Sequence, residues 1–155
     1  MSHFVWTGEY ELGIDVIDQQ HRRIVDYINR VCEVVNESKS RGCINIVLAD
    51  LVDYTFSHLV FEEAMLEEAG YQDLPEHTVA HTTFTKLIKD MQRRCEQGED
   101  IAGDLAVFLQ QWLISHIMSD DAKYVSCVKK ALLEDEVPAQ RSWFQQANAK
   151  YFGGS

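Results

Sequence analysis

Apolar residues recur every three or four positions along four long stretches of this 155-residue chain, which is the spacing of amphipathic α-helices. The first stretch begins near Asp15 or Asp18, either of which can cap a helix, and runs to about Ser38. The second spans roughly residues 44–68 and ends at Gly70, a typical C-cap residue. The apolar stripe of the first contains Ile17, Ile24, Ile28, Val31 and Val35, and that of the second contains Leu48, Leu51, Val52, Leu59, Met65 and Leu66.

Two further stretches follow after short breaks. Pro75 suits the first turn of a helix that continues to Gly98, and the fourth helix is expected from about Ile101 to Glu134. Residues 1–14 are predicted to form an irregular arm, and the aromatic residues beyond Pro138 predict a short C-terminal helix that packs on the bundle, with partner docking as the alternative. Because short connections join long helices, the sequence predicts an all-α fold: an antiparallel up-down-up-down four-helix bundle with an N-terminal arm and a short C-terminal helix.

Ionisable residues interrupt the apolar stripes, where a polar side chain without a partner is costly to bury. A single buried histidine is usually satisfied by one hydrogen bond. Here, however, every predicted bundle helix contributes at least one such residue, and shared metal ions would satisfy all of them together. The residues are His21, His58, Glu62, His77, His81 and His116.

The spacing of these residues supports a metal site. His58 and Glu62 are four residues apart, as are His77 and His81, so each pair projects from one helix face. Imidazole and carboxylate ligands favour iron, manganese, zinc or cobalt over calcium or magnesium. No glutamate lies between the paired histidines as in zinc-protease helices, and no Glu-x-x-His motif typical of ferritin-like oxidases occurs.

Two carboxylates follow His116 in the fourth predicted helix. Asp120 shares a face with His116 on a regular helix, whereas Asp121 is turned away by about 140° at roughly 100° per residue. Spacing alone therefore favours Asp120, and Asp121 can join the cluster only through a π-type bulge. Tyr124 lies two turns beyond His116, where its hydroxyl can hydrogen-bond a ligand.

Charge and composition exclude several other classes of protein. The net charge of −11 disfavours binding to nucleic acid or to anionic lipid, both of which need a cationic surface. No uninterrupted apolar run approaches the roughly 18–20 residues of a membrane span, so membrane insertion is not expected. The four cysteines are scattered without metal-binding or disulfide spacing, and a cytoplasmic location is the expectation.

Taken together, these features resemble the bacterial hemerythrins, and the resemblance runs from Trp6 to about Lys130. All seven ligand positions of that family are filled by the expected residue type in the expected order. The motifs that carry the resemblance are Gly13-Ile-Asp-Val-Ile-Asp-Gln-Gln-His21, His58-x3-Glu62, His77-x3-His81 and His116-x4-Asp121.

The resemblance implies two non-haem iron ions that bind dioxygen reversibly. In the family pattern one iron is bound by His77, His81 and His116, and the other by His21 and His58. Glu62 and Asp121 bridge the irons together with an oxo or hydroxo group, and dioxygen binds as hydroperoxide at the five-coordinate iron. A ligand role for Asp121 requires the π-type bulge, which the resemblance therefore predicts.

The implied function is that of an oxygen carrier or store rather than an enzyme, and it includes delivery to an oxygen-consuming enzyme. Five imidazoles and two carboxylates supply less anionic donation than a carboxylate-rich site, which favours the return of intact dioxygen. Leu59, Trp112, Leu113 and Ile117 flank the ligands as candidate pocket walls, and the family often has an aromatic residue in place of Leu59.

Two alternatives remain open at this stage. The first is an oxygen or redox sensor, and the second is a di-iron peroxidase or nitric-oxide-scavenging enzyme. Residues 1–155 are expected to form a single hemerythrin-like domain, in which the C-terminal extension 135–155 is the one candidate for a signal-transmitting element.

Overall fold

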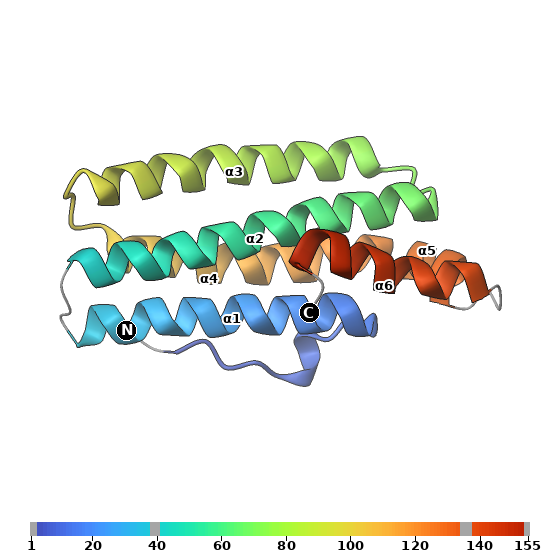
Figure 1. Cartoon of the computed structure of the whole chain (residues 1–155), viewed down its shortest axis with the longest axis horizontal. Coiled ribbons are helices and arrows are strands. Elements are labelled where there is room, and N and C mark those ends of the chain that lie inside the picture. The colour runs from blue at the N-terminus through green and yellow to red at the C-terminus, as the bar shows by residue number, and fades with distance from the viewer. Residues whose placement is uncertain (1–2, 38–40, 134–137, 154–155) are drawn as a thin grey trace.

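Four long helices lie side by side in the computed structural model, which describes residues 3–37, 41–133 and 138–153 (Figure 1). Helix α1 spans Asp15–Asn36, α2 spans Arg41–Ala69, α3 spans Leu74–Glu96 and α4 spans Ala102–Ser115. Successive helices run in opposite directions, and α4 returns to contact α1. The described ranges contain no β-strand. The predicted all-α antiparallel four-helix bundle is therefore confirmed.

The helix ends follow from local sequence. Helix α1 begins at Asp15, and the carboxylate of Asp18 accepts hydrogen bonds from the backbone N–H groups of Leu12 (2.8 Å) and Gly13 (3.1 Å). Gly70 has a φ of 72°, a conformation that glycine adopts without steric cost, so the chain can turn away from α2. Pro75 lies in the first turn of α3, as predicted. The predicted end of the first helix near Ser38 lies outside the described residues.

The fourth helix differs from the single helix predicted for 101–134. Helix α4 ends at Ser115 and is followed by a π-helical segment, η2 (His116–Asp121), and a 3₁₀ turn, η3 (Ala122–Tyr124). A short α-helix, α5 (Val125–Val128), then leads into a second π-helical segment, η4 (Lys129–Leu133). The predicted π-type bulge is thus confirmed, whereas the second π segment was not anticipated from helix spacing.

The arm and the C-terminal helix both pack on the bundle. The described arm residues, 3–14, contain one 3₁₀ turn, η1 (Gly8–Tyr10), and otherwise have no regular structure. Helix α6 (Pro138–Phe152) lies against α2 (Figure 1), where the fully buried Phe61 contacts the rings of Trp143, Tyr151 and Phe152 at centroid distances of 5.7, 6.2 and 5.8 Å. The predicted short C-terminal helix packed on the bundle is confirmed.

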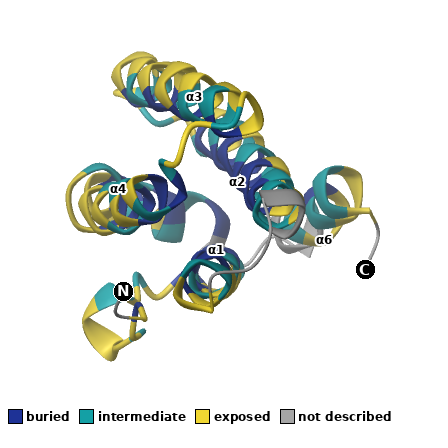
Figure 2. Cartoon of the chain, turned by 90° about the vertical axis from the view of Figure 1, so that its left-hand side faces the viewer, coloured by how far each residue is buried: buried dark blue, intermediate teal, exposed yellow. Residues whose placement is uncertain are grey.

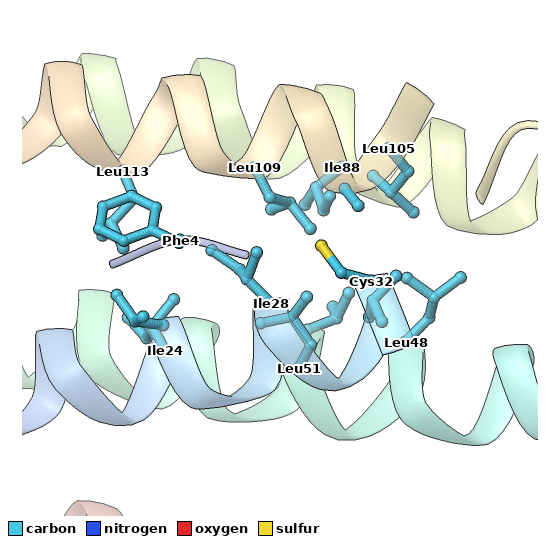
Figure 3. Close-up of a cluster of buried hydrophobic side chains, with 14 of the residues drawn as sticks. Phe4, Ile24, Ile28, Cys32, Leu48, Leu51, Ile88, Leu105, Leu109 and Leu113 are labelled. Atoms are coloured by element: carbon cyan, nitrogen blue, oxygen red, sulfur yellow. The ribbon is translucent and has the colours of Figure 1, made fainter. Parts of the chain in front are cut away.

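The buried faces of the four helices point toward the bundle axis (Figure 2) and form two separate apolar clusters. The larger cluster, part of which Figure 3 shows, fills the end of the bundle where α1 finishes and α2 begins. The smaller one fills the opposite end, beneath α6. Helices α1 and α2 each contribute residues to both clusters. The polar residues of the predicted site lie between the two clusters. The fold therefore places a polar layer between two apolar clusters.

One segment of α2 is long and apolar enough to cross a membrane by length and composition alone. It spans Ile44–Ala69 and contains an 18-residue window of mean hydropathy 1.3, of which 39% is buried. Core helices of globular proteins satisfy the same criterion. The inward face of this segment carries His58 and Glu62, ionisable groups that are costly in lipid.

Candidate metal centre

All seven residues of the predicted ligand set meet in the polar layer between the two apolar clusters, and each is at most 6% exposed. Their ligand atoms form two overlapping groups, and within each group these atoms lie within 4.8 Å of one another. Glu62 and His116 belong to both groups. The first group also contains His21, His58 and Asp121, and the second also contains His77 and His81. The arrangement offers two adjacent cation positions with a shared carboxylate between them.

Glu62 presents one carboxylate oxygen to each position. Its Oε1 lies beside Nε2 of His77, 2.9 Å from Nε2 of His81 and 3.4 Å from Nε2 of His116. Its Oε2 lies 3.5 Å from Nε2 of His58 on the other side. A carboxylate whose two oxygens face different imidazole groups has the orientation of a bridging ligand.

Asp121 reaches the cluster because the π-helical segment η2 inserts one residue into the regular turn. Its Oδ2 lies 3.1 Å from Nε2 of both His21 and His116, and its Oδ1 lies 3.5 Å from Nε2 of His77. Asp120 is instead partly exposed, and its Oδ2 lies 3.7 Å from Nδ1 of His116, on the side of the ring away from the cluster. The π geometry therefore brings Asp121, rather than Asp120, into the cluster.

The nitrogen and oxygen atoms of the cluster are better placed to bind cations than to hydrogen-bond one another. Several fully buried atoms have no hydrogen-bond partner among the described residues, although they lie within ion-pair distance of other cluster atoms. These atoms are Nε2 of His21, His58 and His116 and both carboxylate oxygens of Asp121. Buried polar atoms without partners are unfavourable, and their convergence within a few ångströms is the arrangement that bound metal ions would satisfy.

Burial and mutual charge shape the protonation of the metal-free cluster. Burial lowers the pKa of His58 to about 3 and that of His21 well below its usual range, so both imidazoles keep their lone pairs for a metal at neutral pH. Burial raises the pKa of Asp121 well above its ordinary value, and the nearby Glu62 carboxylate adds to the effect. Burial opposes the charging of His116, but the carboxylates of Asp121 and Glu62 outweigh it and raise the pKa of His116.

Three neighbours orient the cluster residues. Nδ1 of His58 donates a 2.7 Å hydrogen bond to Oε1 of the buried Gln20, which leaves Nε2 as the nitrogen that faces the cluster. Glu63 holds Nδ1 of His81 in the same way at 3.2 Å. The fully buried Tyr124 hydroxyl donates a 3.1 Å hydrogen bond to Oε2 of Glu62, as its position two turns beyond His116 allowed.

The sequence signal for two of these neighbours is weak. Gln20 lies next to His21 in the chain but contacts His58 of another helix, and nothing in its own spacing indicates that role. Glu63 follows Glu62 and has the exposure of an ordinary surface carboxylate, 32% for its side chain. Both assignments depend on which helices become neighbours.

The predicted pocket walls lie beside the cluster. Leu59, Leu113 and Ile117 are at most 3% exposed, and the Trp112 ring stacks on the His116 ring at a centroid distance of 4.8 Å. Leu59 also lines a groove of about 440 Å³ between α2 and α3, which extends to His81. A leucine at this position therefore borders both the apolar core and a surface opening near one ligand.

Fold and site together define a class of protein: a helical bundle whose interior holds a histidine- and carboxylate-rich cluster for two cations. The sequence profile of the hemerythrin HHE cation binding domain matches residues 12–128. The chain is 37% identical over 154 residues to a bacteriohemerythrin of Pseudomonas aeruginosa and 38% identical over 154 residues to one of Stenotrophomonas maltophilia. Each alignment covers 99% of this chain and 100% of the relative.

A solved structure extends the comparison from sequence to fold. The crystal structure of wild-type hemerythrin superposes with a TM-score of 0.76 at 26% identity, covering 82% of this chain and 98% of that one. The chain belongs to the hemerythrin family. Because the bacterial relatives align over nearly all of it, the region of α6, beyond the matched profile, is shared with them.

Proposed function

We propose that this protein binds dioxygen reversibly at a non-haem di-iron centre. The observation that carries the proposal is the pair of overlapping, fully buried ligand groups that share Glu62 and His116. In this assignment His77, His81 and His116 hold one iron, and His21 and His58 hold the other. Glu62 and Asp121 bridge the two. The relatives named bacteriohemerythrin support the same assignment.

The ligand count makes the two positions unequal. In the proposed assignment one position has the three imidazoles of the second group, with His116 counted there, and the other keeps two, while Glu62 and Asp121 serve both. The position of His21 and His58 therefore keeps room for an exogenous ligand. A pair of ferrous ions, when bound, would supply the electrons that dioxygen takes up on binding and gives back on release.

The chain's own residues favour binding over further reaction. Gln20 orients His58 through a neutral amide, and the Tyr124 hydroxyl directs its proton to Glu62 rather than into the pocket. Leu113 and Ile117 are fully buried beside His116 and keep water from that side of the site. Apolar walls, with no proton donor directed at the pocket among these described neighbours, favour release of intact dioxygen over cleavage of its bond.

The proposed role is carriage, storage or delivery of dioxygen to an oxygen-consuming enzyme, in the cytoplasm. The location follows from the scattered cysteines, which suit a reducing compartment. The clustered imidazoles, which outnumber the carboxylates, support an oxygen carrier over an oxidase or a peroxidase.

Iron analysis combined with absorption spectroscopy tests the proposal. The purified protein is reduced, exposed to dioxygen and returned to argon, and its spectrum is recorded at each stage. Two irons per chain, with charge-transfer bands that appear with dioxygen and fade under argon over repeated cycles, are the expected result. Irreversible oxidation at the first exposure, or catalytic consumption of hydrogen peroxide, would refute the carrier function. Protein purified with manganese or zinc in place of iron, and unable to bind dioxygen after loading with iron, would refute the choice of metal.

A further inference from the structure

The N-terminal arm folds back over the bundle and inserts one side chain into its core. Phe4 is 7% exposed and belongs to the larger apolar cluster, whereas the next residue, Val5, is 71% exposed. In Figure 3 the Phe4 ring lies at the end of the cluster that contains Ile24 and Leu113. The opposite end contains Cys32 and Leu105. The arm therefore closes one particular end of this core.

A two-point clamp fixes the arm to α1. The side-chain amide of Asn29 accepts a 2.7 Å hydrogen bond from the backbone N–H of Phe4 and donates a 3.0 Å hydrogen bond to its carbonyl oxygen. At the other end of the arm, the Asp18 carboxylate holds the backbone of Leu12 and Gly13. Between these points Tyr10 contacts the Phe4 ring at a centroid distance of 5.4 Å. The arm is thus an ordered cover whose first anchor depends on one side chain.

The end of the core that Phe4 closes is the end next to the metal ligands. Ile24 lies one helical turn after His21, and Leu113 lies one turn before His116. Both residues are fully buried. Removal of Phe4 would therefore open the apolar wall that separates the ligand cluster from solvent on this side.

We infer that Phe4 controls how fast small molecules reach the metal centre from the side of Ile24 and Leu113 and that Asn29 keeps it in the closed position. The identity of the small molecule as dioxygen rests on the proposed function, but the barrier itself does not require a bound metal. Each hydrogen bond to Asn29 is worth about a fivefold factor in the equilibrium between attached and detached arm, so losing both raises the detached fraction about 25-fold. The rate at which small molecules pass the apolar residues at this end of the core then rises by the same factor.

The test measures access with a buried thiol in the metal-free protein. Leu113→Cys places a thiol at the covered end of the cluster, and the natural Cys32 reports on the opposite end. The rate of reaction with methyl methanethiosulfonate at each thiol is followed by peptide mass spectrometry. The Leu113→Cys protein is compared with and without Asn29→Ala, Phe4→Ala or Phe4→Leu, and Val5→Ala serves as the matched control on the arm.

Asn29→Ala is expected to accelerate reaction at position 113 by about 25-fold and to leave Cys32 unchanged. Phe4→Ala keeps both backbone hydrogen bonds but removes the ring, so it should also accelerate reaction at position 113 and leave Cys32 unchanged. Phe4→Leu should restore most of the protection, and Val5→Ala should have no effect. An equal acceleration at both thiols would show general loosening of the bundle and overturn the inference, as would an unchanged rate at position 113. Because no iron or dioxygen is used, these outcomes are independent of the spectroscopic test of the proposed function.

Discussion

Replacing Asp121 with asparagine should change stability in opposite directions with and without metal. In the metal-free protein both carboxylate oxygens of Asp121 are fully buried and have no hydrogen-bond partner in the described part of the chain, and burial raises the pKa of this group. A raised carboxyl pKa means that the charged form costs folding free energy at neutral pH. The amide of Asp121→Asn removes that charge and can donate to Nε2 of the neutral His21, which lies 3.1 Å from Oδ2 of Asp121.

The expected magnitude follows from the cost of a buried group without a partner, which is roughly 1–3 kcal/mol. For a chain of this length, each kcal/mol shifts the melting temperature by roughly 2–4 °C, so the metal-free variant should melt roughly 2–12 °C higher than the wild type. With metal the sign should reverse, because in the proposed assignment the variant loses a bridging ligand. An ion present at 100 times its dissociation constant contributes about 2.7 kcal/mol of stability, which is lost when it no longer binds.

The assay is thermal unfolding followed by circular dichroism, with and without iron, together with a metal count. Asp120→Asn is the matched control, since it makes the same chemical change one residue earlier. It should retain both irons and lose about tenfold in metal affinity at most, because Asp120 lies 3.7 Å from the outer nitrogen of His116. Loss of an iron in Asp120→Asn, with two irons retained at wild-type affinity in Asp121→Asn, would refute the ligand assignment that the π-helical segment supports.

Three further predictions concern the surroundings of the cluster. Tyr124→Phe removes the 3.1 Å hydrogen bond to Glu62 and should cost about 1.5–3 kcal/mol in urea unfolding; an unchanged midpoint would show that this bond contributes nothing to stability. Burial lowers the pKa of His58 from 6.5 to about 3. Between these two pH values His58 is therefore protonated in the unfolded chain but neutral in the folded chain. The metal-free protein should therefore lose stability as the pH falls from 6.5 toward 3, by up to about 1.4 kcal/mol per pH unit for this group, and a flat urea-midpoint profile over that range would contradict the assignment. Phe61→Ala should cost about 3–5 kcal/mol and shift the fluorescence of Trp143 to the red as α6 loosens; an unshifted spectrum would mean that α6 is held elsewhere.

The two π-helical segments differ in how far the sequence anticipated them. The first, η2, was predicted from the resemblance to hemerythrins, because Asp121 can reach the cluster only if a residue is inserted after His116. The second, η4, lies beyond the ligands and has no counterpart in the motif. Helix spacing assumes regular geometry, so it detects such a departure only where a functional residue would otherwise point the wrong way.

The sequence by itself determined the fold class, the helix periods and the residue types of the site. Apolar periodicity is a property of each helix alone, and the polar residues that interrupt it, such as His21 and His58, mark the site before any helix is placed beside another. Gly70 and Pro75 likewise set helix ends through their own backbone preferences.

Only the tertiary structure decided the contacts between residues that are distant in the chain. Gln20 orients His58 and Tyr124 holds Glu62 because α1, α2 and the segment after η2 pack side by side, which no local pattern specifies. The burial of Phe4 also depends on the arm folding back to Asn29, 25 residues away. Local sequence sets the conformation of each helix, whereas these roles arise from packing, which is a property of several helices at once.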